Sequence, residues 1–327
     1  MEKAAANKDI SILFDFDGTV GDTETPAMEV AFWELGPYLA NTTPDKLDSL
    51  MPEFVRDNAG KAFEFMVDTA NEDRKAAGLC SVEEMFAAKS EPQDMLDAID
   101  PHRKKFGLKT FAELRAPGGG EAENLLVQQK TETVDALSKI AQPCNGVREV
   151  LATLTSSGVP FCISTTSPKP RVPASITACG LDEYFPADKV HSGESDFDPP
   201  RFKPNPSVYL KAAKTEGKDP VNCIAVEDSG SGVGSASNAG VGLTVGYVGA
   251  SHIPDYKKDT HAEMLMAGGR AENGKGAEIV ISDMTDLLKI IEFFAGEKTA
   301  GKSAPFEFPS DLVSGLKKPV WVHGKKA

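Results

Sequence analysis

Two aspartates stand one residue apart at the end of a short apolar run near the start of the chain. The run covers residues 10–16, and Asp15 and Asp17 are followed by Gly18 and Thr19. Carboxylates at positions i and i+2 at a strand end can face one pocket. There they could hold Mg²⁺ through hard oxygen ligands and divide a nucleophilic and an acid–base role. Because Asp-Gly is also a common turn dipeptide, this pair alone is ambiguous.

Three further groups of polar residues occur later in the chain, each at the edge of a predicted element. The run Ser-Thr-Thr-Ser at 164–167 ends one predicted strand, Lys203 precedes a predicted helix, and Glu227 and Asp228 end another predicted strand. Singly these signals are weak, because a serine–threonine run is commonly a turn. A lysine before a proline is usually solvated and adds little to stability. Together, a hydroxyl, an ammonium and two carboxylate pairs predict a site for a phosphate and a metal ion.

Strands and helices that alternate along the chain must bring these residues together. The predicted strands cover 10–16, 159–165, 221–228, 241–248 and 277–283, and the predicted helices cover 147–157, 172–180, 205–217 and 229–240. Alternation of buried apolar strands with helices predicts an α/β fold with a Rossmann-like, doubly wound parallel sheet. Sites in such sheets form at the carboxyl ends of the strands, where all of the polar groups above are predicted to lie.

One long helical stretch interrupts this alternation. Apolar residues recur with a helical period from about residue 27 to 141, and we expect Thr25 to cap the first of these helices with Pro26 at its first position. The stretch is therefore predicted to be an inserted α-helical cap domain. The predicted division is a core of residues 1–24 and 142–296, a cap of residues 25–141, and a C-terminal extension of residues 297–327. Residues 251–276 are expected to form a surface excursion.

Composition excludes several classes of function. The 327 residues carry a formal net charge of −14, which disfavours nucleic acid and anionic membranes as partners. No apolar run approaches the length of about 20 residues that a membrane helix needs. Five scattered cysteines without a C-x-x-C pair favour a reducing compartment. We expect a monomer in the cytoplasm, or in a plastid stroma if a transit peptide has been removed.

Taken in order, these motifs resemble those of the haloacid dehalogenase superfamily. Asp-Phe-Asp-Gly-Thr is similar to its first motif, the strand ending in Ser/Thr to its second, Lys203 to its third, and Glu227-Asp228 to its fourth. A helical insertion after the first motif resembles subfamily I with its α-helical C1 cap. The segments DGTVGDTE and FKPNPSVYLKAA look most like the branch of β-phosphoglucomutase and the CbbY-like phosphatases.

The resemblance implies a role for each motif residue. Asp15 would attack phosphorus and form an aspartyl-phosphate, and Asp17 would protonate the leaving oxygen and then activate water. Thr165 would hold the transferring phosphoryl group together with the backbone of Thr166, and Lys203 would neutralise charge. The implied substrate-binding residues include Gly18. The implied Mg²⁺ ligands are Asp15, the backbone carbonyl of Asp17, Glu227 and Asp228. The serine-rich run leaves two registers open, and Thr165 is preferred over Ser164.

The implied activity is a Mg²⁺-dependent phosphatase of a small phosphorylated metabolite. A sugar phosphate or a bisphosphate of the xylulose-1,5-bisphosphate type would suit the CbbY-like resemblance. Arg56 and Lys61 in the cap are candidate contacts for the distal end of such a substrate. The alternatives are a phosphomutase like β-phosphoglucomutase and a non-catalytic binding protein of the same fold. The five histidines show no metal-ligand spacing and receive no role.

Overall fold

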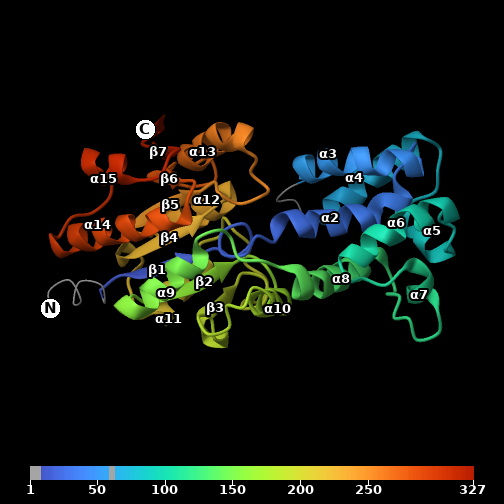
Figure 1. Ribbon diagram of the computed structural model, residues 1–327, viewed down its shortest axis with the longest axis horizontal. Coiled ribbons are helices and arrows are strands. Elements are labelled where there is room, and N and C mark those ends of the chain that lie inside the picture. The colour runs from blue at the N-terminus through green and yellow to red at the C-terminus, as the bar shows by residue number, and fades with distance from the viewer. Residues whose placement is uncertain (1–8, 59–62) are drawn as a thin grey trace. The chain divides into compact units, whose positions relative to one another are not determined.

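A sheet of eight strands forms the centre of the larger part of this protein. The structure is a computed structural model and describes residues 9–58 and 63–327. The strands lie in the order β3-β2-β1-β4-β5-β6-β7-β8. Their bounds are β1 Ser11–Phe14, β2 Phe161–Thr165, β3 Val190–Ser192, β4 Cys223–Glu227, β5 Leu243–Tyr247, β6 Ile279–Ile281, β7 Val320–Val322 and β8 Lys325–Lys326. The chain adds strands first to one side of β1 and then to the other, so the predicted doubly wound α/β fold is confirmed (Figure 1).

Strands β1 to β6 are parallel, and their pairing decides where the polar motifs meet. All four residues of β1 are buried, which explains its continuous apolar run. Phe14 is in register with Ile163 of β2 on one side and with Val226 of β4 on the other. The residues that follow these three positions therefore emerge side by side, at the carboxyl edge of the sheet.

The C-terminal residues complete the sheet with two antiparallel strands. Strand β7 pairs with β6, and β8 pairs with β7. The buried ring of Trp321 in β7 packs in one apolar cluster with Ala262 and Leu265. The sequence does not predict β7 or β8, nor the short strand β3. Residues 297–327, which the sequence separates as an extension, lie in the same compact unit as the sheet.

Helices lie between successive strands of this unit along the chain. They are α9 Val147–Ser157, α10 Arg171–Ala178, α11 Ser207–Thr215, α12 Gly230–Asn238, α13 Lys258–Ala267, α14 Leu287–Thr299 and α15 Ser310–Gly315. Helices α11 and α12 pack on the central strands through Tyr209 and Ala236, which share an apolar cluster with Leu13 and Ala225. Helix α13 lies within the predicted surface excursion 251–276 and buries Leu265.

The chain divides into two compact units, one of residues 1–22 and 142–327 and the other of residues 23–141. Every regular element in the described residues of the second unit is a helix. Its helices are α2 Glu24–Leu35, α3 Leu47–Asn58, α4 Phe63–Ala76, α5 Val82–Ala88, α6 Gln93–Lys105, α7 Phe111–Arg115 and α8 Leu125–Ile140. Within the first unit, the Asp22 N–H donates to the Gln142 carbonyl at 2.8 Å, so the chain leaves and re-enters the sheet-bearing unit at adjacent points.

The start of α2 differs from the prediction. The N-cap position is held by Thr23 rather than Thr25, and Pro26 lies in the first turn instead of at the first helical position. A proline is tolerated there because the first backbone N–H groups of a helix have no intrahelical partner.

None of the helices in residues 9–58 and 63–327 is both long and apolar enough to cross a membrane.

Candidate active site

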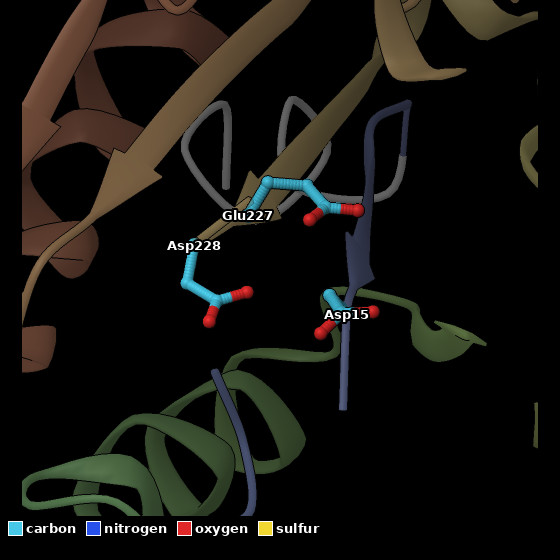
Figure 2. A group of neighbouring side chains, drawn as sticks. All are labelled: Asp15, Glu227 and Asp228. Carbon is cyan, nitrogen blue, oxygen red and sulfur yellow. The ribbon is translucent and has the colours of Figure 1, made fainter. Parts of the chain in front are cut away.

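Three carboxylates meet at the carboxyl ends of β1 and β4. Asp15 follows the last residue of β1, Glu227 ends β4, and Asp228 is the next residue. All three are buried, and each offers an oxygen atom within 4.8 Å of an oxygen atom of the other two. Figure 2 shows their side chains directed toward a common space. The register of β1 with β4 produces this arrangement, because Phe14 pairs with Val226 and the next residue of each strand is a carboxylate.

A single ammonium group joins two of these carboxylates. The Lys203 Nζ atom lies 2.6 Å from Asp15 Oδ1 and 2.6 Å from Glu227 Oε1. Only 3% of the Lys203 side chain is exposed, so the expectation of a solvated lysine is wrong. The hydroxyl of Tyr209 donates to the same Glu227 oxygen at 2.5 Å. The Lys203 ammonium therefore donates one hydrogen bond to Glu227 and another to Asp15, which fixes its position between the two carboxylates.

Burial and mutual repulsion shift the pKa values of this cluster. Burial raises the pKa of Asp15 well above its ordinary value; Lys203 opposes this, and Glu227 and Asp228 add to it. Burial also raises the pKa of Glu227, although Lys203 again opposes the shift. Burial alone would lower the pKa of Lys203, but the two carboxylates outweigh it and raise that pKa above the ordinary value. Lys203 therefore remains an ammonium ion at neutral pH.

These residues fit a hard divalent cation. Three carboxylates lie beside one ammonium, so the cluster carries excess negative charge when all three are ionised. All donors are carboxylate oxygens, which are the ligands that Mg²⁺ prefers in proteins. A bound divalent cation would balance this charge without protonating the cluster.

The turn after Asp17 packs against Asp228. Gly18 has a φ of +82°, and a Cβ atom built there would lie 2.2 Å from Asp228 Oδ2. Glycine is therefore required both by the backbone conformation and by the approach of the carboxylate. Thr19 adds a long hydrogen bond, from its hydroxyl to Asp228 Oδ1 at 3.4 Å. The predicted substrate-binding residue Gly18 thus lies against a predicted metal ligand.

Asp17 is held by one side chain from the loop after β2 and one from the start of α10. The Ser167 hydroxyl donates to Asp17 Oδ2 at 2.5 Å, and Arg171 Nη2 donates to Asp17 Oδ1 at 2.7 Å. Thr165 ends β2, and its hydroxyl accepts from the Ser167 backbone N–H at 3.1 Å. The predicted Thr165 is therefore linked to Asp17 through Ser167. The Ser164 hydroxyl is buried and has no hydrogen-bond partner within the described part of the chain.

The remaining predicted site residues are Thr166, Arg56 and Lys61. Thr166 follows β2 and is half-buried. Arg56 lies in α3, but its side chain is outside what the structure describes, and Lys61 is outside the described residues altogether.

Sequence reasoning missed several contacts of the site. These are Ser167 and Arg171 on Asp17, Tyr209 on Glu227, and His252 and His261 on Asp228. Ser167 is the last residue of the Ser-Thr-Thr-Ser run at 164–167, and its place in that run could have indicated that it belongs to the site. The two histidines come from a segment predicted to be a surface excursion, and their spacing of nine residues carries no motif.

The pKa shifts predict how the stability of the metal-free protein depends on pH. In the unfolded chain, Asp and Glu titrate near pH 3.9 and about 4.3. Because the folded pKa values of Asp15 and Glu227 are raised, the folded state retains protons that the unfolded chain releases. The contribution of these two groups to stability should therefore fall as the pH rises above about 4, where the unfolded chain has begun to lose these protons and the folded protein still keeps them.

Melting temperatures in EDTA across this pH range test the expectation. Glu227→Gln keeps an oxygen for Lys203 and Tyr209 but cannot ionise, so its melting temperature should fall less with rising pH than that of the wild type. An identical pH dependence of the two proteins would contradict the assignment of this effect to Glu227.

Comparisons with known proteins agree with the α/β fold of the sheet-bearing unit. The sequence model of a family described as haloacid dehalogenase-like hydrolase matches residues 11–240. A solved structure of a conserved haloacid dehalogenase-like protein from Agrobacterium tumefaciens is similar in fold, with a TM-score of 0.55 and 24% sequence identity. That alignment covers 87% of this chain and 98% of the other.

Two curated proteins show sequence similarity over shorter stretches. A CBBY-like protein of Arabidopsis thaliana is 31% identical over 134 residues, which are 40% of this chain and 41% of that protein. The 6-phosphogluconate phosphatase of Escherichia coli strain K12 is 34% identical over 90 residues, 28% of this chain and 39% of that protein. The aligned part thus spans about two fifths of the length of these relatives.

Proposed function

Because this chain belongs to the haloacid dehalogenase-like hydrolase family, we propose that it is a phosphatase of a small phosphorylated metabolite. The observation that supports the proposal most is the buried cluster at the ends of β1 and β4. There Lys203 contacts Asp15 and Glu227, and Asp228 completes the group of carboxylates. A carboxylate nucleophile needs such a setting, because only nearby positive charge overcomes its repulsion from a phosphate dianion.

In the proposed reaction, Asp15 is the nucleophile. An Asp15 carboxylate oxygen forms a bond to phosphorus, the bond from phosphorus to the leaving oxygen breaks, and Asp17 gives that oxygen its proton. Water then attacks the aspartyl-phosphate while Asp17 takes a proton from it. The acyl-phosphate P–O bond breaks, which releases inorganic phosphate and restores both aspartates. Ser167 and Arg171 each donate a hydrogen bond to one oxygen of Asp17, so this side chain must give up one of these partners to reach the leaving oxygen.

Thr165 and Lys203 would bind the transferring phosphoryl group in this proposal. Thr165 ends β2 beside the Ser167–Asp17 contact, which agrees with the register preferred from the sequence. The ammonium of Lys203 remains charged and would stabilise negative charge on the phosphoryl oxygens and on Asp15.

Mg²⁺ is the proposed cofactor. Asp15, Asp228 and the Asp17 backbone carbonyl would hold it, with Glu227 ligating or supporting through water. When bound, it would supply positive charge that offsets the repulsion between the nucleophile and the phosphate.

The proposed substrate is a sugar phosphate or sugar bisphosphate, with the xylulose-1,5-bisphosphate type as the first candidate. The name of one relative supports a phosphorylated sugar derivative, since that protein is a 6-phosphogluconate phosphatase. That Arg56 and Lys61 contact the distal end of this substrate remains a prediction from the sequence.

Phosphate release from a panel of phosphorylated sugars and sugar acids tests the proposed function. With Mg²⁺ present, at least one substrate should yield inorganic phosphate with a kcat of about 1 s⁻¹ or more, in the common range for enzymes. EDTA should stop the reaction, and added Mg²⁺ should restore it. Full activity in EDTA would contradict the metal site. Faster conversion of a hexose 1-phosphate to its 6-phosphate than release of phosphate would replace the phosphatase by a mutase.

A further inference from the structure

Segment 251–276, to which the sequence assigned no role, contacts the candidate metal site at two points. It follows β5, contains α13, and ends before β6. His252 Nε2 lies 3.2 Å from Asp228 Oδ2, and only 9% of the His252 side chain is exposed. His261 Nε2 in α13 lies 2.6 Å from the backbone carbonyl oxygen of Asp228. One aspartate is thus contacted by two histidines, at its side chain and at its main chain.

The chemistry of the acceptors decides the direction of both contacts. A carbonyl oxygen only accepts, so His261 donates to Asp228 through Nε2–H. A carboxylate oxygen likewise accepts, so His252 donates through its own Nε2–H. Two donors at the two ends of one residue restrict both the rotation of its carboxylate and the path of its backbone.

The surroundings of His252 leave little room for another arrangement. A Cβ atom on Gly18 would lie 2.7 Å from His252 Cε1, so the ring fits closely over the turn that follows Asp17. The neighbouring Ser251 donates through its hydroxyl to Asp22 Oδ1 at 2.7 Å, which ties the start of the segment to the same turn. His252 is therefore placed between the turn and Asp228 by contacts on both sides.

We infer that His252 and His261 are positioning residues that hold Asp228 in the orientation required to bind a divalent cation. The inference rests on the proposed function, because that function makes Asp228 a Mg²⁺ ligand. Groups that hydrogen-bond to ligating residues fix the direction of the ligand atoms, and their loss typically weakens metal binding about 10- to 100-fold. Neither histidine is assigned contact with the cation itself.

Isothermal titration with MgCl₂ tests this inference without measuring activity. His252→Phe retains a ring of similar size but has no donor, whereas His252→Gln retains an N–H at about the same reach. The dissociation constant for Mg²⁺ should rise about 10-fold or more for His252→Phe and stay within about 3-fold of wild type for His252→Gln. His261→Phe and His261→Gln should show the same contrast.

His323→Ala is the matched control. This histidine follows β7, three strands away from β4 in the sheet, and contacts the Phe306 carbonyl instead. Its Mg²⁺ affinity should equal that of the wild type. The rise in melting temperature at one fixed concentration of Mg²⁺ is a second measurement, and this rise should be smaller than in the wild type only for the phenylalanine variants.

The outcomes separate this inference from the proposed function. Wild-type affinity in both phenylalanine variants, with the wild type itself binding Mg²⁺, would overturn the positioning role and leave the phosphatase proposal intact. Equal losses in the phenylalanine and glutamine variants would also overturn it, since the donor would then not matter. A wild type that binds no Mg²⁺ would refute the metal site and this inference with it.

Discussion

Asp15→Asn should lower kcat by at least about 10⁴-fold, the scale observed when a catalytic nucleophile is removed. An amide oxygen cannot replace a carboxylate as the group that attacks phosphorus. The fold should survive, because Asn Oδ1 can still accept the hydrogen bond that Lys203 donates to Asp15 Oδ1 at 2.6 Å. In EDTA, the melting temperature of the variant should be no lower than that of the wild type near neutral pH, since the substitution removes one charge from a buried group of carboxylates.

A matched control is Asp9→Asn. Asp9 is exposed and precedes the amino end of β1, whereas Asp15 follows its carboxyl end. The control should keep the wild-type kcat and melting temperature. If Asp15→Asn retained more than a tenth of the wild-type kcat, Asp15 would not be the nucleophile. A large fall in its metal-free melting temperature would instead indicate that Asp15 is retained for stability.

Lys203→Ala should reduce kcat by about 10²-fold or more, the effect of removing one preorganised electrostatic partner of a transition state. The structure also changes the expected effect of Lys203→Ala on stability. An exposed lysine would leave it unaffected, but Lys203 is buried between Asp15 and Glu227. Its removal leaves Asp15, Glu227 and Asp228 together without the ammonium, so the metal-free melting temperature should fall.

This loss of stability should depend on pH. Without Lys203, protonation of a carboxylate is the remaining way to reduce the repulsion, so the deficit in melting temperature should grow as the pH rises. Added Mg²⁺ should restore part of the melting temperature that Lys203→Ala loses. Lys211→Ala is the control, because Lys211 forms an ion pair with Asp196 and is 38% exposed. A kcat within threefold of wild type for Lys203→Ala would remove Lys203 from the proposed reaction.

The sequence by itself identified β1, β2, β4, β5 and β6 and the edge of the sheet at which they end, but not β3, β7 or β8. A run such as Ser-Ile-Leu-Phe in β1 can be buried on both faces only in a sheet covered on both sides, so its composition identifies the element. A parallel sheet places the carboxyl ends of all its strands at one edge, and the order of the motifs along the chain was therefore sufficient to group Asp15, Lys203, Glu227 and Asp228.

Only the tertiary structure decided what surrounds these carboxylates. The sequence did not show that Lys203 is buried, because burial depends on Asp15 and Glu227, which lie 188 and 24 residues away in the chain. It also did not show that His252 and His261 reach Asp228. Their segment has no periodic pattern that fixes its path, and its contacts arise from packing against the Gly18 turn. Local pattern specifies elements, whereas contacts between side chains far apart in the sequence depend on how those elements and the loops between them pack.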